Sequence, residues 1–194
     1  VHGTNAGLLL DLVNADAAWT SAANQRAQFP ALLQPKLQVF PDAYDAALFH
    51  PAAESSRTVG SLELPTDRPI VSFTSRGLER RRGFDTFLQV AWRVQQRRPD
   101  VCFVVLGDDQ PQYDAPPPPG APSLREQLWA RYPGDKAAFL FHRVVPPRDL
   151  VRLYRLTTVH TYLSDPYVLS WSPRNAMACG ALLVAADHAA TRDL

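Results

Sequence analysis

The chain has 194 residues, of which 46% are hydrophobic and 20% charged, and its formal net charge is +1. This composition is typical of a soluble globular protein with one substantial core, and it excludes an intrinsically disordered chain. The near-neutral charge, without a lysine-rich run, also excludes a dedicated nucleic-acid-binding protein, because binding to phosphate backbones requires clustered cations.

Residues 1–50 differ from the remainder of the chain. The segment "AGLLLDLVNADAAW" (6–19) predicts a helix, and "LQVFPDAYDAALFHP" (37–51) is typical of an irregular connection. We therefore expect residues 1–50 to be the end of a preceding domain and its linker, and residues 51–194 to form a second domain. The sequence does not begin with Met and stops directly after a predicted strand, so we expect a fragment that is cut at both ends.

From residue 60 onward, predicted strands and helices alternate. Apolar runs predict strands at 69–75, 101–107, 137–141, 158–163 and 181–186. Helices are predicted at 83–99, 123–132 and 147–156 and from 172 onward. Such alternation indicates an α/β fold with a Rossmann-like parallel sheet that is covered by helices on both faces. Ligands of such sheets bind at the carboxyl ends of the strands.

The segment "QPQYDAPPPPGAP" (110–122) interrupts this alternation. A proline-rich stretch of this kind could be a ligand for an SH3-type domain, but we interpret it as a stiff surface insertion.

The two cysteines, Cys102 and Cys179, stand in apolar segments without a CxxC motif or a Cys/His cluster. We predict buried free thiols, no metal site, and a reducing, cytoplasmic setting. No segment reaches the roughly 20 apolar residues of a membrane helix. A region outside this sequence could still attach the protein peripherally to the inner face of a membrane.

The first candidate for a functional site is "FTSRGLERRRGFDTF" (73–87). Here Arg76 and Gly77 follow a strand, and Arg82 and Gly83 lead into a helix, whose first amide groups attract anions. Two guanidinium groups at such a position are suited to a diphosphate, whereas the simpler interpretation is a solvated arginine-rich loop. Neither GxGxxG nor GxxxxGK[ST] is present, so no dinucleotide or P-loop motif is predicted.

The second candidate is "LSDPYVLSWSPRNAMACG" (163–180). Ser172 is predicted to cap a helix that begins with Pro173, and the amides of Ser170 to Ser172 would then face an anion. Asn175 would be the third helical residue and would face the same cleft. A capped helix that only packs against the core is the simpler alternative.

Together these segments resemble a known family. The segments "SRGLERRRGF", "RRPDVCFVVLGDD", "FHRVVP" and "YVLSWSPRNAMACGALLVAAD" are similar to the C-terminal, donor-binding half of family-4 glycosyltransferases. These are GT-B enzymes with two Rossmann-like domains, and the resemblance covers roughly residues 5–194. It implies a retaining transfer of a sugar from a nucleoside-diphosphate sugar to a glycan or lipid-linked acceptor. A fragment that lacks the acceptor domain is expected to be inactive by itself.

The resemblance also implies roles for particular residues. Arg76 and Arg82 would hold the diphosphate and stabilise the leaving group, without a metal ion or another cofactor. The donor would further contact Gly77, Arg143, Leu169, Ser170, Trp171, Ser172 and Asn175. No catalytic base is assigned, since His160 is expected in the core, and His188 is the only histidine considered for the cleft.

Several positions depart from the family pattern. Asn175 replaces the glutamate that binds the ribose, Tyr167 replaces another glutamate, Ser170 and Arg143 replace glycines, and Pro41 and Ala43 replace residues of the linker motif. The alternative is therefore a non-catalytic, glycosyltransferase-like scaffold module that has lost donor binding. A third hypothesis is an unrelated doubly wound phosphate-binding domain with Asp108 and Asp109 as its acidic pair. Neighbouring side chains of a strand point to opposite sides, which argues against one shared metal site.

Overall fold

The computed structural model describes residues 5–166 and 169–194, and the chain forms two compact units. Unit 1 comprises residues 1–44, 166–171 and 186–194, and unit 2 comprises residues 45–165 and 172–185. The first boundary lies six residues before the predicted one at residue 50, and unit 1 takes up two later segments as well. The assignment of residues 1–50 and 51–194 to two domains of a larger enzyme stays a prediction.

Unit 1 contains two short parallel strands, β1 (Ala18–Thr20) and β2 (Leu37–Val39). Its helices are α1 (Ala6–Asn14), α2 (Ala23–Arg26), η2 (Gln34–Lys36) and η5 (Thr191–Asp193). The helix predicted over residues 6–19 is wrong in its second half, because α1 ends at Asn14 and the chain continues into β1. The Lys36 ammonium group satisfies carbonyl groups at this end of the helix, donating to the backbone oxygens of Leu12, Val13 and Ala15 at 3.2, 2.8 and 2.8 Å.

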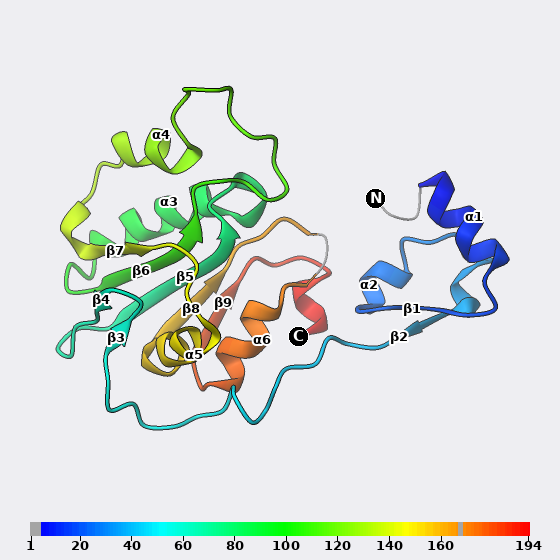
Figure 1. Cartoon of the computed structure of the whole chain (residues 1–194), viewed down its shortest axis with the longest axis horizontal. Helices are drawn as coiled ribbons and strands as arrows, with labels where there is room; N and C mark the ends of the chain where they lie inside the picture. Colours follow the sequence, from blue (N-terminus) through cyan, green and yellow to red (C-terminus); the bar gives the residue numbers. More distant parts are fainter. Residues whose placement is uncertain (1–4, 167–168) are drawn as a thin grey trace. The chain divides into compact units, whose positions relative to one another are not determined.

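Unit 2 is built on a five-stranded parallel sheet with the strand order β7-β6-β5-β8-β9 (Figure 1). The strands are β5 (Ile70–Gly77), β6 (Cys102–Asp108), β7 (Phe139–His142), β8 (Val159–Tyr162) and β9 (Leu182–Ala185). The connecting helices are η3 (Arg80–Arg82), α3 (Phe84–Gln95), α4 (Leu124–Ala130), η4 (Lys136–Ala138), α5 (Pro147–Leu156) and α6 (Trp171–Ala178). An antiparallel pair, β3 (Thr58–Val59) and β4 (Leu62–Glu63), precedes the sheet. The predicted α/β class is confirmed.

Helices cover both faces of this sheet, as Figure 1 shows for α3 and α4 on one side and α5 and α6 on the other. On the first face, Phe84 and Phe87 of α3 are fully buried against Phe73 of β5 and its neighbours. On the second face, Leu153 of α5 packs against the strands, and Tyr154 packs against α6. Alternate residues of β5 thus serve two separate cores, as a strand period of two requires.

Local sequence signals locate most of the helix ends. Ser123 and Glu126 form the predicted capping box of α4, with bonds of 3.2 and 2.8 Å. α5 has the predicted bounds, whereas α3 ends at Gln95, before the expected limit at Pro99. Both cysteines are buried free thiols, as predicted.

Candidate functional site

The strand order of unit 2 reverses beside β5. The chain runs from β5 outward through β6 to β7, and it then returns to the other side of β5 with β8 and continues to β9. In open parallel sheets, ligands bind outside the carboxyl ends of the strands at such a reversal. The two connections that begin there are the turn after β5, which carries Arg82, and the segment after β8, which leads to α6. The predicted site therefore lies at the position in this sheet where a ligand is expected.

Backbone contacts hold the turn after β5 against the segment after β8. Gly83 begins α3 with a φ of 77°, a left-handed conformation that glycine adopts most readily. A β-carbon at Gly83 would overlap the backbone oxygen of Leu163. Asp165 donates its backbone N–H to the backbone oxygen of Arg81 at 2.8 Å. These contacts place the helix start beside the end of β8.

The two predicted arginines lie on different elements and in different environments, Arg76 in the last part of β5 and Arg82 in η3. Arg82 is only 8% exposed, and its guanidinium carbon lies 4.8 Å from the centre of the Tyr113 ring. Arg76 is exposed at the end of β5. The structure thus fixes the orientation of one guanidinium group and leaves the other at the surface. The sequence did not single out Tyr113, although its position soon after β6 places it at the same edge of the sheet.

Gly77 is needed by the chain's own backbone. A β-carbon at this position would lie 2.7 Å from the backbone oxygen of Gln110 and 3.3 Å from the α-carbon of Pro111. The glycine therefore permits the loop after β6 to approach the end of β5. A contact between Gly77 and a donor stays a prediction.

Arg143 lies just beyond β7, next to the end of β6. Its Nε and Nη2 atoms donate to the same Asp108 carboxylate oxygen, at 3.1 and 2.5 Å. The bonds from Arg143 lower the pKa of Asp108 below its ordinary value. Asp109, just beyond β6, instead pairs with Arg125 at 2.5 Å, so the two adjacent carboxylates have different partners. The predicted placement of Arg143 beside a nucleobase stays a prediction.

The predicted cap of α6 is wrong in its register. The helix begins at Trp171, so Ser172 and Pro173 are its second and third residues, and Asn175 is its fifth. Proline is tolerated there because the first amide groups of a helix have no partner within it. The Ser172 hydroxyl does not act as the expected N-cap; its oxygen lies 3.3 Å from Nε2 of His160 in β8. The start of α6 is thereby connected to the sheet through a side chain.

His160 is fully buried, as predicted, and it is part of a polar network that the sequence did not reveal. The Thr157 hydroxyl has a single proton, which its 2.8 Å contact assigns to the backbone oxygen of Leu153. The Thr157 hydroxyl also lies 3.1 Å from the Ser72 hydroxyl, which lies 2.9 Å from Nδ1 of His160. Burial lowers the pKa of His160 to about 3, so the ring is neutral.

A second pair of hydroxyl groups, those of Tyr154 and Thr74, lies close to His160 on the same face of the sheet. The hydroxyl of Tyr154 in α5 lies 2.9 Å from that of Thr74 in β5, and the Tyr154 ring meets the His160 ring edge-on at 5.1 Å. Burial raises the pKa of Tyr154, which keeps its hydroxyl neutral. The signal in the sequence was the presence of Ser72 and Thr74 at alternate positions of an otherwise apolar strand.

The remaining predicted donor contacts are placed as follows. Asn175 is 9% exposed, and its side chain has no hydrogen bond to any other residue in the described ranges 5–166 and 169–194. Leu169, Ser170 and Trp171 belong to unit 1, so their placement against the arginines stays a prediction. Tyr167 lies outside the described residues.

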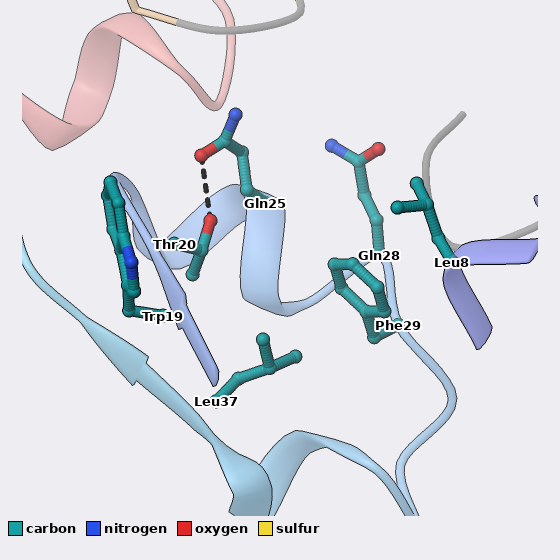
Figure 2. A pocket seen from close by; sticks show the side chains of 7 residues that line it. All are labelled: Leu8, Trp19, Thr20, Gln25, Gln28, Phe29 and Leu37. Atoms are coloured by element: carbon teal, nitrogen blue, oxygen red, sulfur yellow. Dashed lines mark hydrogen bonds between the residues drawn. The ribbon is translucent and has the colours of Figure 1, made fainter. Parts of the chain in front are cut away.

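A hollow of about 150 Å³ occurs in unit 1, and none of its lining residues is a predicted site residue. It is lined by Leu8, Trp19, Thr20, Gln25, Gln28, Phe29 and Leu37 (Figure 2). Its polar groups are uncharged, and the Thr20 hydroxyl donates to the Gln25 side chain at 2.8 Å. We assign no chemistry to it.

Among the described residues, no group of three His, Cys, Asp or Glu side chains could hold a metal ion. No helix in that part of the chain is long and apolar enough to cross a membrane. His188, considered for the cleft, lies in unit 1, where its backbone N–H donates to the Thr191 hydroxyl at 3.2 Å.

Comparison with known proteins identifies the fold. No protein-family model matches the chain, and no curated protein gives a significant sequence match. Among solved structures, Anabaena Alr3699/HepE in complex with UDP-glucose matches with a TM-score of 0.71 and 17% identity, over 99% of this chain and 51% of that chain. Sucrose-phosphate synthase from Thermosynechococcus elongatus matches with a TM-score of 0.69 and 21% identity, over 91% and 43%.

A third structure is an isolated domain. The C-terminal domain of LpcC, a glycosyl transferase group 1 family protein from Francisella tularensis, matches with a TM-score of 0.55 and 19% identity, over 74% of this chain and 70% of that domain. The present chain spans about half the length of the HepE and sucrose-phosphate synthase chains. The predicted fold class, that of a GT-B C-terminal domain, is thereby confirmed.

Proposed function

We propose that this chain is the donor-binding half of a retaining glycosyltransferase of the family-4 type. The donor is a nucleoside-diphosphate sugar, and the acceptor is a hydroxyl group of a glycan or a lipid-linked glycan. In the transfer, the bond between the anomeric carbon and the diphosphate oxygen breaks, and its electron pair remains on the diphosphate. The acceptor oxygen forms the new bond, and the proton of the acceptor hydroxyl passes to the leaving diphosphate.

The observation that carries this proposal is the buried Arg82 guanidinium at the reversal of the strand order. Negative charge develops on the leaving diphosphate, and a preoriented cation stabilises it more strongly in a site from which water is largely excluded. Arg82 combines low exposure with a fixed ring partner, Tyr113. Arg76, exposed near the end of β5, would also contact the diphosphate when the donor is bound. No metal ion is needed for this role in our proposal.

The remaining donor contacts follow from the second helix start. The backbone amides at Ser170 to Ser172 would meet the sugar and diphosphate, with Leu169 and Trp171 beside them. The Asn175 side chain is buried and has no hydrogen-bond partner among the described residues, and it would donate to a ribose hydroxyl. Arg143 would lie next to the base.

Two of the structural neighbours support a uridine nucleotide as the first donor to test. HepE was solved with UDP-glucose, and a pneumococcal O-GlcNAc transferase, GtfA, was solved with UDP and GlcNAc. Because the chain spans about half the length of HepE, acceptor binding would depend on residues outside it, and we expect no transfer by this chain alone. We propose a cytoplasmic location, in which residues outside this sequence would attach the protein peripherally to the inner face of a membrane.

Calorimetric titration with UDP-, GDP- and ADP-sugars tests the proposal. One of the three should bind, and the double variant Arg76→Ala/Arg82→Ala should bind it about 100-fold more weakly, because two charge-assisted contacts are lost. The matched control is Arg93→Ala/Arg97→Ala, which removes the same charge from exposed positions near the end of α3. Unchanged affinity in the first variant would refute the phosphate assignment.

The alternative of a scaffold module that has lost donor binding arises from Asn175. On our proposal, Asn175→Glu should strengthen donor binding about 5-fold or more, because a charge-assisted bond replaces a neutral one. On the scaffold alternative, neither the wild-type chain nor this variant binds any of the three donors.

A further inference from the structure

The turn that carries Arg82 is interlocked with the start of the proline-rich loop after β6. Glu79 is 1% exposed, and its Oε2 atom accepts the backbone N–H groups of Gln112, Tyr113 and Asp114 at 3.1, 2.9 and 2.9 Å. One carboxylate oxygen thus fixes three successive amide groups of the loop. Bonds to a charged acceptor are stronger than neutral ones, so this attachment is a firm one.

Asp114 makes the reciprocal attachment. Its Oδ2 atom accepts the backbone N–H groups of Arg80 and Arg81 at 3.0 and 3.4 Å, and its Oδ1 atom lies 3.8 Å from Nε of Arg81. We call these two sets of contacts the Glu79–Asp114 clamp. The proline-rich loop is therefore anchored at its start, directly beside the turn of the predicted diphosphate site.

The clamp places an aromatic ring against the guanidinium group of Arg82. Tyr113 is the middle of the three residues whose amides Glu79 holds, and its ring centre lies 4.8 Å from Cζ of Arg82. A ring face orients a guanidinium group by cation–π attraction and adds no negative charge of its own.

The two carboxylate oxygens of Glu79 differ in their hydrogen bonding. Its Oε1 atom is buried and has no hydrogen-bond partner among residues 5–166 and 169–194. A buried carboxylate oxygen without a partner costs free energy. The carboxylate is three residues from Arg82 in the chain, yet its hydrogen bonds go to the amides around Tyr113.

We propose that Tyr113 and Glu79 are positioning residues for diphosphate binding: the Tyr113 ring holds the Arg82 guanidinium in its binding orientation, and Glu79 holds the ring. This inference rests on the proposed function, in which Arg82 contacts the diphosphate. It extends that function to a loop on which the resemblance placed no functional residue.

A double-mutant cycle tests it. In the full chain, affinities for UDP, GDP and ADP are measured by calorimetry for the wild type, Tyr113→Leu, Arg82→Ala and the combination. Tyr113→Leu should weaken binding of the preferred diphosphate about 3- to 30-fold. In the Arg82→Ala background the same substitution should change affinity less than about twofold, since the ring acts through the guanidinium. Tyr113→Phe, which keeps the ring, should bind like the wild type.

Glu79→Gln keeps an acceptor oxygen but removes its charge, and it should follow the same pattern as Tyr113→Leu. Thermal melts establish that each variant is folded. If Glu79→Gln does not fold, Asp114→Asn, which weakens the reciprocal half of the clamp, takes its place in the same comparison.

The outcomes separate the two proposals. If Arg82→Ala binds the diphosphates as tightly as the wild type, or if the wild type binds none, the proposed function and this inference both fail. If Arg82→Ala weakens binding but Tyr113→Leu does not, or weakens it equally in both backgrounds, only the positioning role is refuted.

Discussion

Lowering the pH from 7 to 5 should destabilise the chain through one buried residue, His160. The ring is fully buried, and its neighbours are the hydroxyl groups of Ser72 in β5 and Ser172 in α6 and the edge of the Tyr154 ring in α5. None of these groups carries a charge that would stabilise an imidazolium ion.

The magnitude follows from the two pKa values of His160. A histidine in the unfolded chain has a pKa near 6.5, whereas burial lowers the pKa of His160 in the folded state to about 3. Between these values the unfolded chain binds a proton that the folded chain does not bind. The free energy of unfolding is therefore at its full value above pH 6.5 and falls by about 1.4 kcal/mol for each pH unit below it. The expected loss at pH 5 is about 2 kcal/mol.

Urea unfolding at pH 7, 6 and 5 measures this loss, with His160→Gln as the comparison. The variant should be less stable than the wild type at pH 7 by about 1–3 kcal/mol, because a buried hydrogen-bonded ring is lost. That difference should shrink by about 2 kcal/mol at pH 5, since glutamine does not titrate.

A difference between wild type and His160→Gln that is the same at pH 7 and pH 5 would refute this reasoning. If the variant does not fold, the ring signals of His160 in the wild type decide the question by NMR. They should stay constant from pH 7 to pH 5, and a titration in that range would contradict the prediction.

Two further predictions concern other contacts of the sheet edge. In urea unfolding, Gly83→Ala should destabilise the chain by at least about 2 kcal/mol, because a side chain there is strained at a φ of 77° and overlaps Leu163. The control is Gly120→Ala, at a φ of 79° but with no atom within 4 Å, which should destabilise the chain by only about 1 kcal/mol. Equal losses would show that the overlap with Leu163 is relieved without cost. Arg143→Ala should raise the pKa of Asp108 toward its ordinary value in an NMR titration, because the bonds that lower it are removed. An unchanged Asp108 pKa would contradict the pairing.

Much of unit 2 was predictable from local pattern. The apolar stripe at residues 84, 87, 88, 91 and 94 predicts both α3 and its buried face; Phe84, Phe87, Leu88 and Ala91 are buried, and Val94 is partly buried. The capping box of α4 and the bounds of α5 also follow from neighbouring residues. These features succeed because hydrogen bonds and side-chain spacing within one element involve residues only a few positions apart.

Two of the wrong predictions involve contacts between separate parts of the chain. α1 ends where Lys36 meets its last carbonyl groups, and the hydroxyl of Ser172, expected to cap α6, contacts His160 instead. Neither contact has a counterpart in the neighbouring sequence. For the same reason the pairing of Glu79 with the amides around Tyr113 left no local pattern.

The order of residues alone determined that strands and helices alternate and that an arginine-rich segment connects the strand at 70–77 to a helix. Only the tertiary structure decided which strands are neighbours, that Arg82 is buried against Tyr113 while Arg76 is exposed, and that a neutral His160 contacts α6. The physical reason is that periodicity records which face of an element is apolar, whereas burial and pairing of a polar side chain depend on which distant backbone folds against it.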